Sequence, residues 1–296
     1  MSPTSFQIGM GLHIVGYPAL AATVGLVVSR VLPAGSRARA AALVGAAGAG
    51  LVTSHVGLAG QPPWPPIDSI GWIPIVTAAT AATLMIAALV VPRRAAALVT
   101  GALLALATLA AVYYAGRPTF LRSFDRYWAL AGLATAGVVA GAGLLTAATD
   151  RSVRPAPWVA WIVVAAGLAG CTLWSHSALV AMLLGSAAVT AGVIGVGGAI
   201  LGVKDIGPAP AGVFMVHVAA TASYAHLYAK LPAWVLMTAL LAALAPIAVP
   251  VAMSGRRRLV AAALGVLIAA GLTGLAAQRM HAKDAASVKD AASMYY

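Results

Sequence analysis

Residues 72–91 read WIPIVTAATAATLMIAALVV, twenty consecutive positions without a charged side chain. An α-helix rises about 1.5 Å per residue, so about 20 apolar residues cross the roughly 30 Å hydrocarbon core of a bilayer. Pro92, Arg93 and Arg94 follow directly and end the apolar run. The stretch therefore predicts a transmembrane helix that ends at a basic turn on the membrane surface.

The rest of the chain repeats this pattern. Hydrophobic residues make up 62% of the sequence and charged residues only 8%, whereas soluble domains carry about 25% charged residues. A water-soluble fold is therefore excluded, and only helices or closed barrels satisfy their backbone hydrogen bonds in lipid. We expect an all-α polytopic membrane helix bundle of about ten transmembrane helices, over residues 10–32, 40–59, 72–91, 95–115, 128–148, 158–174, 178–203, 211–229, 233–253 and 259–277. Residues 1–277 then form a single transmembrane domain, and residues 278–296 form a polar C-terminal tail that should fray in water.

The basic residues set the expected orientation, because cytoplasmic loops of membrane proteins are enriched in Lys and Arg. With the N-terminus outside, four basic residues lie in outer loops, namely Arg117, Arg122, Arg126 and Lys230. Eleven then lie inside, namely Arg30, Arg37, Arg39, Arg93, Arg94, Arg151, Arg154, Lys204, Arg256, Arg257 and Arg258. We therefore expect both termini outside, in a bacterial inner membrane.

Several function classes are disfavoured by what the sequence lacks. The net charge of +12 sits in short clusters between apolar runs, which is typical of insertion signals and not of a nucleic-acid surface. All six acidic residues are Asp and lie in predicted loops or the tail, so a pump driven by an intramembrane carboxylate is not expected. No phosphate-binding loop or familiar catalytic motif is present, and no catalytic residue can be named.

Histidine is the residue type whose placement predicts chemistry. His13, His55, His176 and His226 all fall within a turn or two of the predicted outer surface, and neutral imidazole is a ligand of haem iron and copper. Met10 lies three residues before His13 on the same helical face, a pair that suits copper, whereas two facing histidines suit haem b. The alternative is that these histidines only bond headgroups or backbone. We expect His217, nearer the inner side, to be a polar packing residue.

The outer loop from Gly116 to Tyr127 contains Arg117, Arg122 and Arg126. Three outward arginines oppose the usual charge bias, so we expect them to bind an anionic group. Lipid phosphate, an acidic patch on a partner protein and the propionates of a haem are the candidates. A lipid-modifying enzyme would also use them for phosphate, although no general base accompanies them.

The outer loop Gly60–Asp68 contains four prolines, which favour an extended and stiff backbone. It resembles a Pro-Pro-x-Pro-Pro-x-Asp loop of uncharacterised bacterial polytopic membrane proteins, over about a dozen residues. That resemblance implies no function. The loop is expected to be a rigid connector, a docking surface or a cover over a site.

These observations predict a non-catalytic integral membrane subunit of a larger bacterial inner-membrane assembly, associated with electron transfer at its periplasmic face. Its expected partners are membrane lipids and protein subunits that bind the outer face and the C-terminal tail, and no nucleic acid. One alternative is a ten-helix small-molecule transporter with two inverted halves. Another is a haem- or copper-binding membrane protein.

Overall fold

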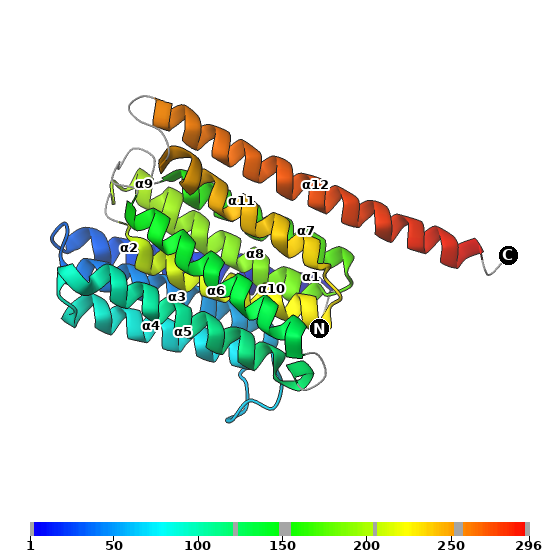
Figure 1. Ribbon diagram of the computed structural model, residues 1–296. Helices are drawn as coiled ribbons and strands as arrows, with labels where there is room; N and C mark the ends of the chain where they lie inside the picture. Colours follow the sequence, from blue (N-terminus) through cyan, green and yellow to red (C-terminus); the bar gives the residue numbers. More distant parts are fainter. Residues whose placement is uncertain (1–2, 121–123, 148–154, 204–205, 252–256, 294–296) are drawn as a thin grey trace.

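A computed structural model describes residues 3–120, 124–147, 155–203, 206–251 and 257–293 (Figure 1). These residues form helices and no strands, so the predicted all-helical fold is confirmed for them. In chain order the helices are α1 (Pro3–Gly11), η1 (Leu12–Gly16), α2 (Tyr17–Val31), α3 (Arg37–Ala59), α4 (Trp72–Val90), α5 (Arg93–Phe120), α6 (Phe124–Ala147), α7 (Pro155–Trp174), α8 (Ala178–Gly192), η2 (Val193–Gly197), α9 (Gly198–Ile200), α10 (Pro208–Tyr228), α11 (Ala233–Val251) and α12 (Arg257–Ser293).

The protein is an integral membrane protein by the length and composition of its helices. Seven helices within the described residues are long and apolar enough to cross a bilayer. They cover Gln7–Val31, Arg37–Ala59, Trp72–Val90, Arg94–Gly116, Ala156–Trp174, Ala178–Ile200 and Val260–Ala286. Tyr127–Gly143 and Ala233–Ala245 are shorter apolar helices. The expected count of ten spans and the placement of the termini stay predictions.

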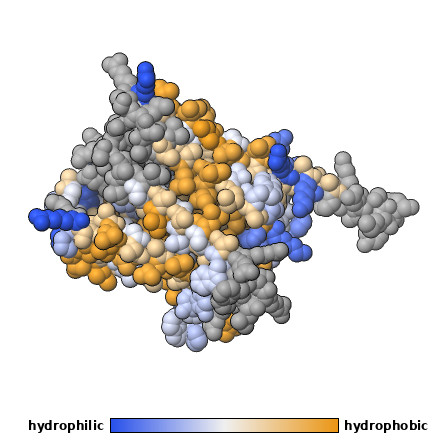
Figure 2. Space-filling model, viewed as in Figure 1, coloured by the Kyte–Doolittle hydropathy of each residue, from blue (hydrophilic) through white to orange (hydrophobic). Residues whose placement is uncertain are grey.

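Large apolar side chains cover much of the outer surface of the bundle. Val24, Leu98, Ile200 and Leu267 are more than half exposed on candidate spans. Figure 2 shows apolar residues across the middle of the visible face and hydrophilic residues nearer the ends of the helices. Such a surface is stable against lipid tails and would be an aggregation hazard in water.

Helix α10 lies at the centre of the bundle, where it contacts α3, α4, α5, α6 and α8. Helix α10 is not among the apolar helices named above as candidate spans or as shorter apolar helices. Its apolar residues are interrupted by His217, Thr221, Ser223 and His226. Polar side chains inside a membrane bundle normally face other helices and not lipid. The central position of α10 therefore explains its composition and makes it the natural place for a site.

Small residues allow the close helix contacts, as expected for packing in lipid. Two Gly-x-x-x-Gly seams occur in the sequence, Gly137 with Gly141 and Gly198 with Gly202. In the first, Gly137 packs against Leu240 of α11 and Gly141 against Met215 of α10. That seam is therefore an intramolecular contact. In the second, Gly198 packs against Ile206, whereas Gly202 follows α9 with a positive φ of 69° and ends the helix.

The first candidate span, Gln7–Val31, contains a π-helical turn, η1, just before Pro18. Because Pro18 has no N–H to donate, one turn of the ordinary hydrogen-bond ladder is interrupted there. The backbone N–H of Tyr17 instead donates to the carbonyl of Leu12, five residues earlier. The interruption at Pro18 thus takes the form of a local π turn, which contains His13.

Helix α12 continues through most of the tail that was expected to fray. It runs 37 residues to Ser293 and extends past the other helices (Figure 1). Two contacts join it to the α7–α8 turn. The rings of Trp174 and His281 lie 5.3 Å apart, and Nε2 of His176 lies 3.4 Å from Oδ1 of Asp284.

Candidate functional site

Two histidines are buried together between α3 and α10. His55 is 1% exposed and His217 is 0% exposed. Their ring centroids lie 6.2 Å apart and their ring planes are almost perpendicular, at 89°. Histidine is seldom completely buried unless its polar atoms have partners, so this pair is the most unusual chemical feature of the bundle interior.

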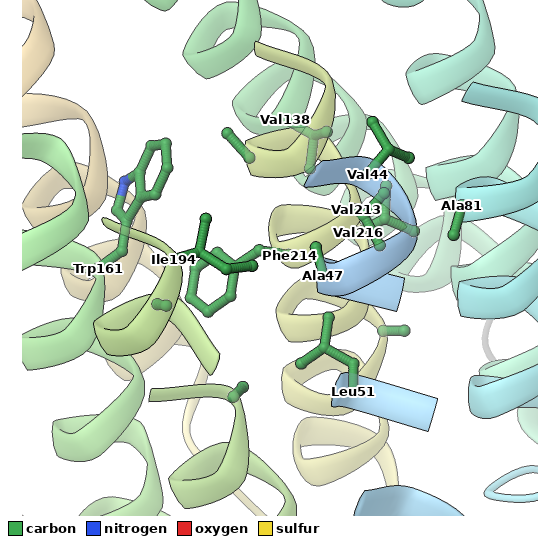
Figure 3. Packing of buried hydrophobic residues seen from close by; sticks show 14 of the residues in the cluster. Val44, Ala47, Leu51, Ala81, Val138, Trp161, Ile194, Val213, Phe214 and Val216 are labelled. Carbon is green, nitrogen blue, oxygen red and sulfur yellow. The ribbon is translucent and has the colours of Figure 1, made fainter. Parts of the chain in front are cut away.

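Apolar packing one turn away fixes the spacing of the two helices. Ala47 and Leu51 of α3 belong to the same buried cluster as Val213 and Val216 of α10, and Figure 3 shows these side chains near one another. Leu51 precedes His55 by four residues, which places the two on one face of α3. The core therefore presents His55 towards α10.

Thr77 of α4 holds the ring of His217. Its hydroxyl oxygen lies 2.8 Å from the carbonyl of Ile73 and 2.9 Å from Nδ1 of His217. A hydroxyl has a single hydrogen, and here it is donated to the Ile73 carbonyl. Nδ1 of His217 must therefore carry the hydrogen of the second bond, which leaves Nε2 as an unprotonated acceptor.

The remaining ring nitrogens of the pair are poorly satisfied. Within the described part of the chain, Nε2 of His217 and both nitrogens of His55 are buried without a hydrogen bond of good geometry, and the backbone of Ile70 lies near enough to act on the ring of His55. Each unsatisfied buried polar group costs about 1 to 3 kcal/mol. A bound water or ion is the usual explanation for such groups in a folded protein.

The Pro-rich loop between α3 and α4 is joined to the end of α10. Asp68 accepts a hydrogen bond of 2.9 Å from the backbone N–H of Gly71. The hydroxyls of Ser69 and Tyr228, the last residue of α10, lie 3.2 Å apart. Asp68 is exposed and is close enough to His55 to interact with it electrostatically. The loop therefore links the surface of the bundle to the buried pair.

The other predicted histidines have separate surroundings. His13 packs against Gly57 of α3, and its carbonyl accepts a 3.0 Å bond from Ser54. Its Nδ1 is buried without a partner, and Met10 in the preceding turn is half-buried.

His176 is exposed and pairs with Asp284, whereas Nδ1 of His226 lies 2.6 Å from the carbonyl of Leu231. None of these contacts joins two of the four predicted histidines. Across the described residues, no three His, Cys, Asp or Glu side chains lie close enough together to hold a metal ion. The roles of His13, Met10, His176 and His226 as ligands stay predictions.

The three outer arginines cannot be placed at a site. Arg122 lies outside the described residues, and the side chains of Arg117 and Arg126 also lie outside the described part, although their backbones end α5 and begin α6. Their anion-binding role stays a prediction.

Sequence reasoning missed the partner of His55. The depth of His217 in the membrane was counted from the end of its helix, as if all helices ended at the same depth. In the structure, His55 lies four residues from the end of α3 and His217 eleven residues from the end of α10. At about 1.5 Å per residue these offsets are roughly 6 Å and 16 Å. Since the two rings are adjacent, α10 extends well beyond α3. The recurrence of threonine at every third position of α4, at Thr77, Thr80 and Thr83, was the available signal for Thr77.

No protein-family model, curated protein or solved structure matches this chain.

The spacing of the two rings is compatible with one ion between them, and direct helix packing leaves no slot for a porphyrin. Two metal–nitrogen bonds of about 2 Å, with the half-width of two rings, give ring centroids about 5 to 6.5 Å apart. The observed 6.2 Å lies in that range. A haem would need a slot between the rings for its macrocycle, whereas α3 and α10 pack directly against each other.

Proposed function

We propose that this chain is a multispan membrane protein that binds one cuprous ion between His55 and His217. The observation that carries the proposal is the bond between Thr77 and Nδ1 of His217. Metal-binding histidines almost always donate their second ring N–H to a fixed acceptor, which orients the ring and raises the basicity of the ligating nitrogen. Thr77 is such an acceptor.

The chemistry of the donor set selects the metal. Imidazole suits copper, zinc, iron and nickel, but structural zinc sites use four protein ligands and octahedral metals need oxygen donors. Among the described residues, no third His, Cys, Asp or Glu completes such a set. Copper(I), with a filled d shell and a single charge, accepts two nitrogen ligands. Neutral imidazoles also limit the charge that must be buried.

The proposed topology gives the ion a route from one side. With ten spans and both termini outside, the Pro-rich loop lies on the outer face of a bacterial inner membrane. Asp68 on that loop then attracts a cation to the surface above His55. The protein would receive copper from the periplasmic side and hold it in the outer half of the membrane.

The test is metal content and affinity under reducing conditions. Full-length protein in mild detergent is loaded with cuprous ion in ascorbate, separated from free metal and analysed for copper. We expect about one copper per chain, with loss of binding in His55→Ala and His217→Ala. His176→Ala is the matched control and should bind as the parent does. A haem Soret band in the purified protein, or equal binding by all variants, would refute the proposal.

A second candidate is the non-catalytic subunit of a larger assembly. It is favoured by two exposed apolar side chains on the Pro-rich loop, Trp64 at 79% and Ile67 at 89% exposure, and by the extension of α12 beyond the bundle (Figure 1). Exposed apolar groups of this kind often mark contact sites. Purification in gentle detergent should then yield stoichiometric partner subunits, and a lone monodisperse monomer would count against it.

A further inference from the structure

A cavity lies apart from the histidine pair, between four helices, and it is partly open to the surroundings of the bundle. Its volume is about 120 Å³, and it lies between α6, α7, α10 and α11. It exists because α10 makes few contacts with α7 and α11, although it packs closely on α3 and α5. Of the side chains that line it, Ser223 has the only hydroxyl, and the others are apolar apart from the indole nitrogen of Trp161.

One end of the cavity is closed by aromatic rings. Trp161 and Phe214 stack with centroids 5.8 Å apart and an interplanar angle of 21°. The indole Nε1 of Trp161 donates a 3.1 Å hydrogen bond to the carbonyl of Ala243 on α11. Because that N–H is already used, the closed end offers no polar group to a ligand.

The other end carries a hydroxyl. Along α10 the lining runs from Phe214 to Ser223, which is about 13 Å of helix at 1.5 Å per residue. Ser223 lies towards Tyr228 and is only 2% exposed. Its hydroxyl makes no hydrogen bond with the described residues. The cavity is thus long and apolar, with one free hydroxyl at the end nearest the Pro-rich loop.

We propose that this cavity binds the hydrocarbon chain of a membrane lipid, with a carbonyl oxygen at the head of the chain accepting a hydrogen bond from Ser223. Water is a poor occupant, because a buried water needs two to four polar partners. The phase around these helices is hydrocarbon, so a lipid chain reaches the cavity directly. An ester carbonyl of a glycerolipid and a ring carbonyl of an isoprenoid quinone share this chemistry. The inference does not depend on the copper proposal.

Photochemical crosslinking tests the site. The full chain is placed in nanodiscs that contain phosphatidylcholine with a diazirine in its acyl chain, and adducts are located by peptide mass spectrometry. We expect adducts to concentrate on the lining residues Ala219 and Leu240. In Ala219→Leu, which fills the cavity, their yield should fall about tenfold. Ala136→Leu, at an exposed position of α6, is the matched control and should leave the yield unchanged.

Further variants distinguish the outcomes. Ala239→Leu on α11 fills the cavity from another helix and serves if Ala219→Leu does not fold. Ser223→Ala should spread the adducts along α10, because the carbonyl no longer fixes the position of the chain. A short-chain benzoquinone in excess suppresses the adducts if the natural ligand is a quinone and not if it is a glycerolipid. Equal adduct yields on lining and exposed faces, or no change in either filled variant when folded, would overturn the proposal.

Discussion

The imidazole of His217 donates its Nδ1 hydrogen to the hydroxyl of Thr77 across 2.9 Å, between two different helices. This bond decides which nitrogen of the ring is left unprotonated. It also predicts that Thr77, which does not touch the proposed ion, affects the affinity of the protein for that ion.

Thr77→Val should weaken cuprous binding about 10- to 100-fold, as loss of such a partner does at other metal sites. Valine keeps the shape of threonine but leaves Nδ1 unpaired. Thr80→Val is the matched control, because Thr80 is also buried in α4 and bonds only the carbonyl of Val76. Competition with a coloured cuprous chelator measures both affinities, and equal losses would contradict the role given to Thr77.

The contact between Ser69 and Tyr228 should hold the Pro-rich loop closed. Ser69→Ala and Tyr228→Phe each remove one hydroxyl of a single bond, worth about 0.5 to 1.5 kcal/mol. Each should speed release of bound copper to a chelator by a few-fold. Since both act on one bond, the double variant should release copper no faster than either single variant. Additive effects would show that the two hydroxyls act separately.

Gly57 should tolerate no side chain, because a Cβ there would overlap the ring of His13. Gly57→Ala should therefore lower the melting temperature of the protein in detergent through overpacking of about 1 to 3 kcal/mol. Gly101→Ala is the opposite case, since a Cβ at Gly101 meets open space. Alanine should stabilise α5 there by up to about 1 kcal/mol. The same sign for both variants would contradict the packing of His13.

Reporter fusions test the proposed topology. Alkaline phosphatase fused after Tyr296 or inserted at Pro63 should be active, and green fluorescent protein at the same sites should be dark. When the chain is truncated at Arg94 and fused there, alkaline phosphatase should be inactive and green fluorescent protein should fluoresce. A fluorescent C-terminal fusion would place the C-terminus in the cytoplasm. That result would exclude the proposed topology, in which ten spans leave both termini outside.

Local composition predicted the helices well. Residues 72–91 were expected to span the membrane, and α4 covers Trp72–Val90, because an uncharged run of that length has few other stable conformations in lipid. The tail was expected to fray, yet α12 continues through most of it, to Ser293. The sequence shows its polarity but not the contacts of His281 and Asp284 with the α7–α8 turn.

Of the buried histidine pair, the sequence placed only His55 among the candidate ligands. His55 was among the candidate ligands because its distance from a helix end could be counted. His217 was placed too far from it, because counting cannot reveal how far one helix extends past another. Positions in the membrane plane depend on packing of side chains such as Leu51 and Val213, and one sequence does not specify which helices become neighbours. Thr77 could be found only once α4, α3 and α10 were seen together.

Copper K-edge X-ray absorption of the reduced, copper-loaded protein identifies the atoms bound to the ion. We expect a cuprous edge, two nitrogen scatterers at about 2 Å and the outer-shell pattern of imidazole, all lost in His217→Ala and retained in His176→Ala. Sulfur or oxygen scatterers that persist in His217→Ala, or protein that retains no copper after removal of free metal, would contradict the proposed copper site.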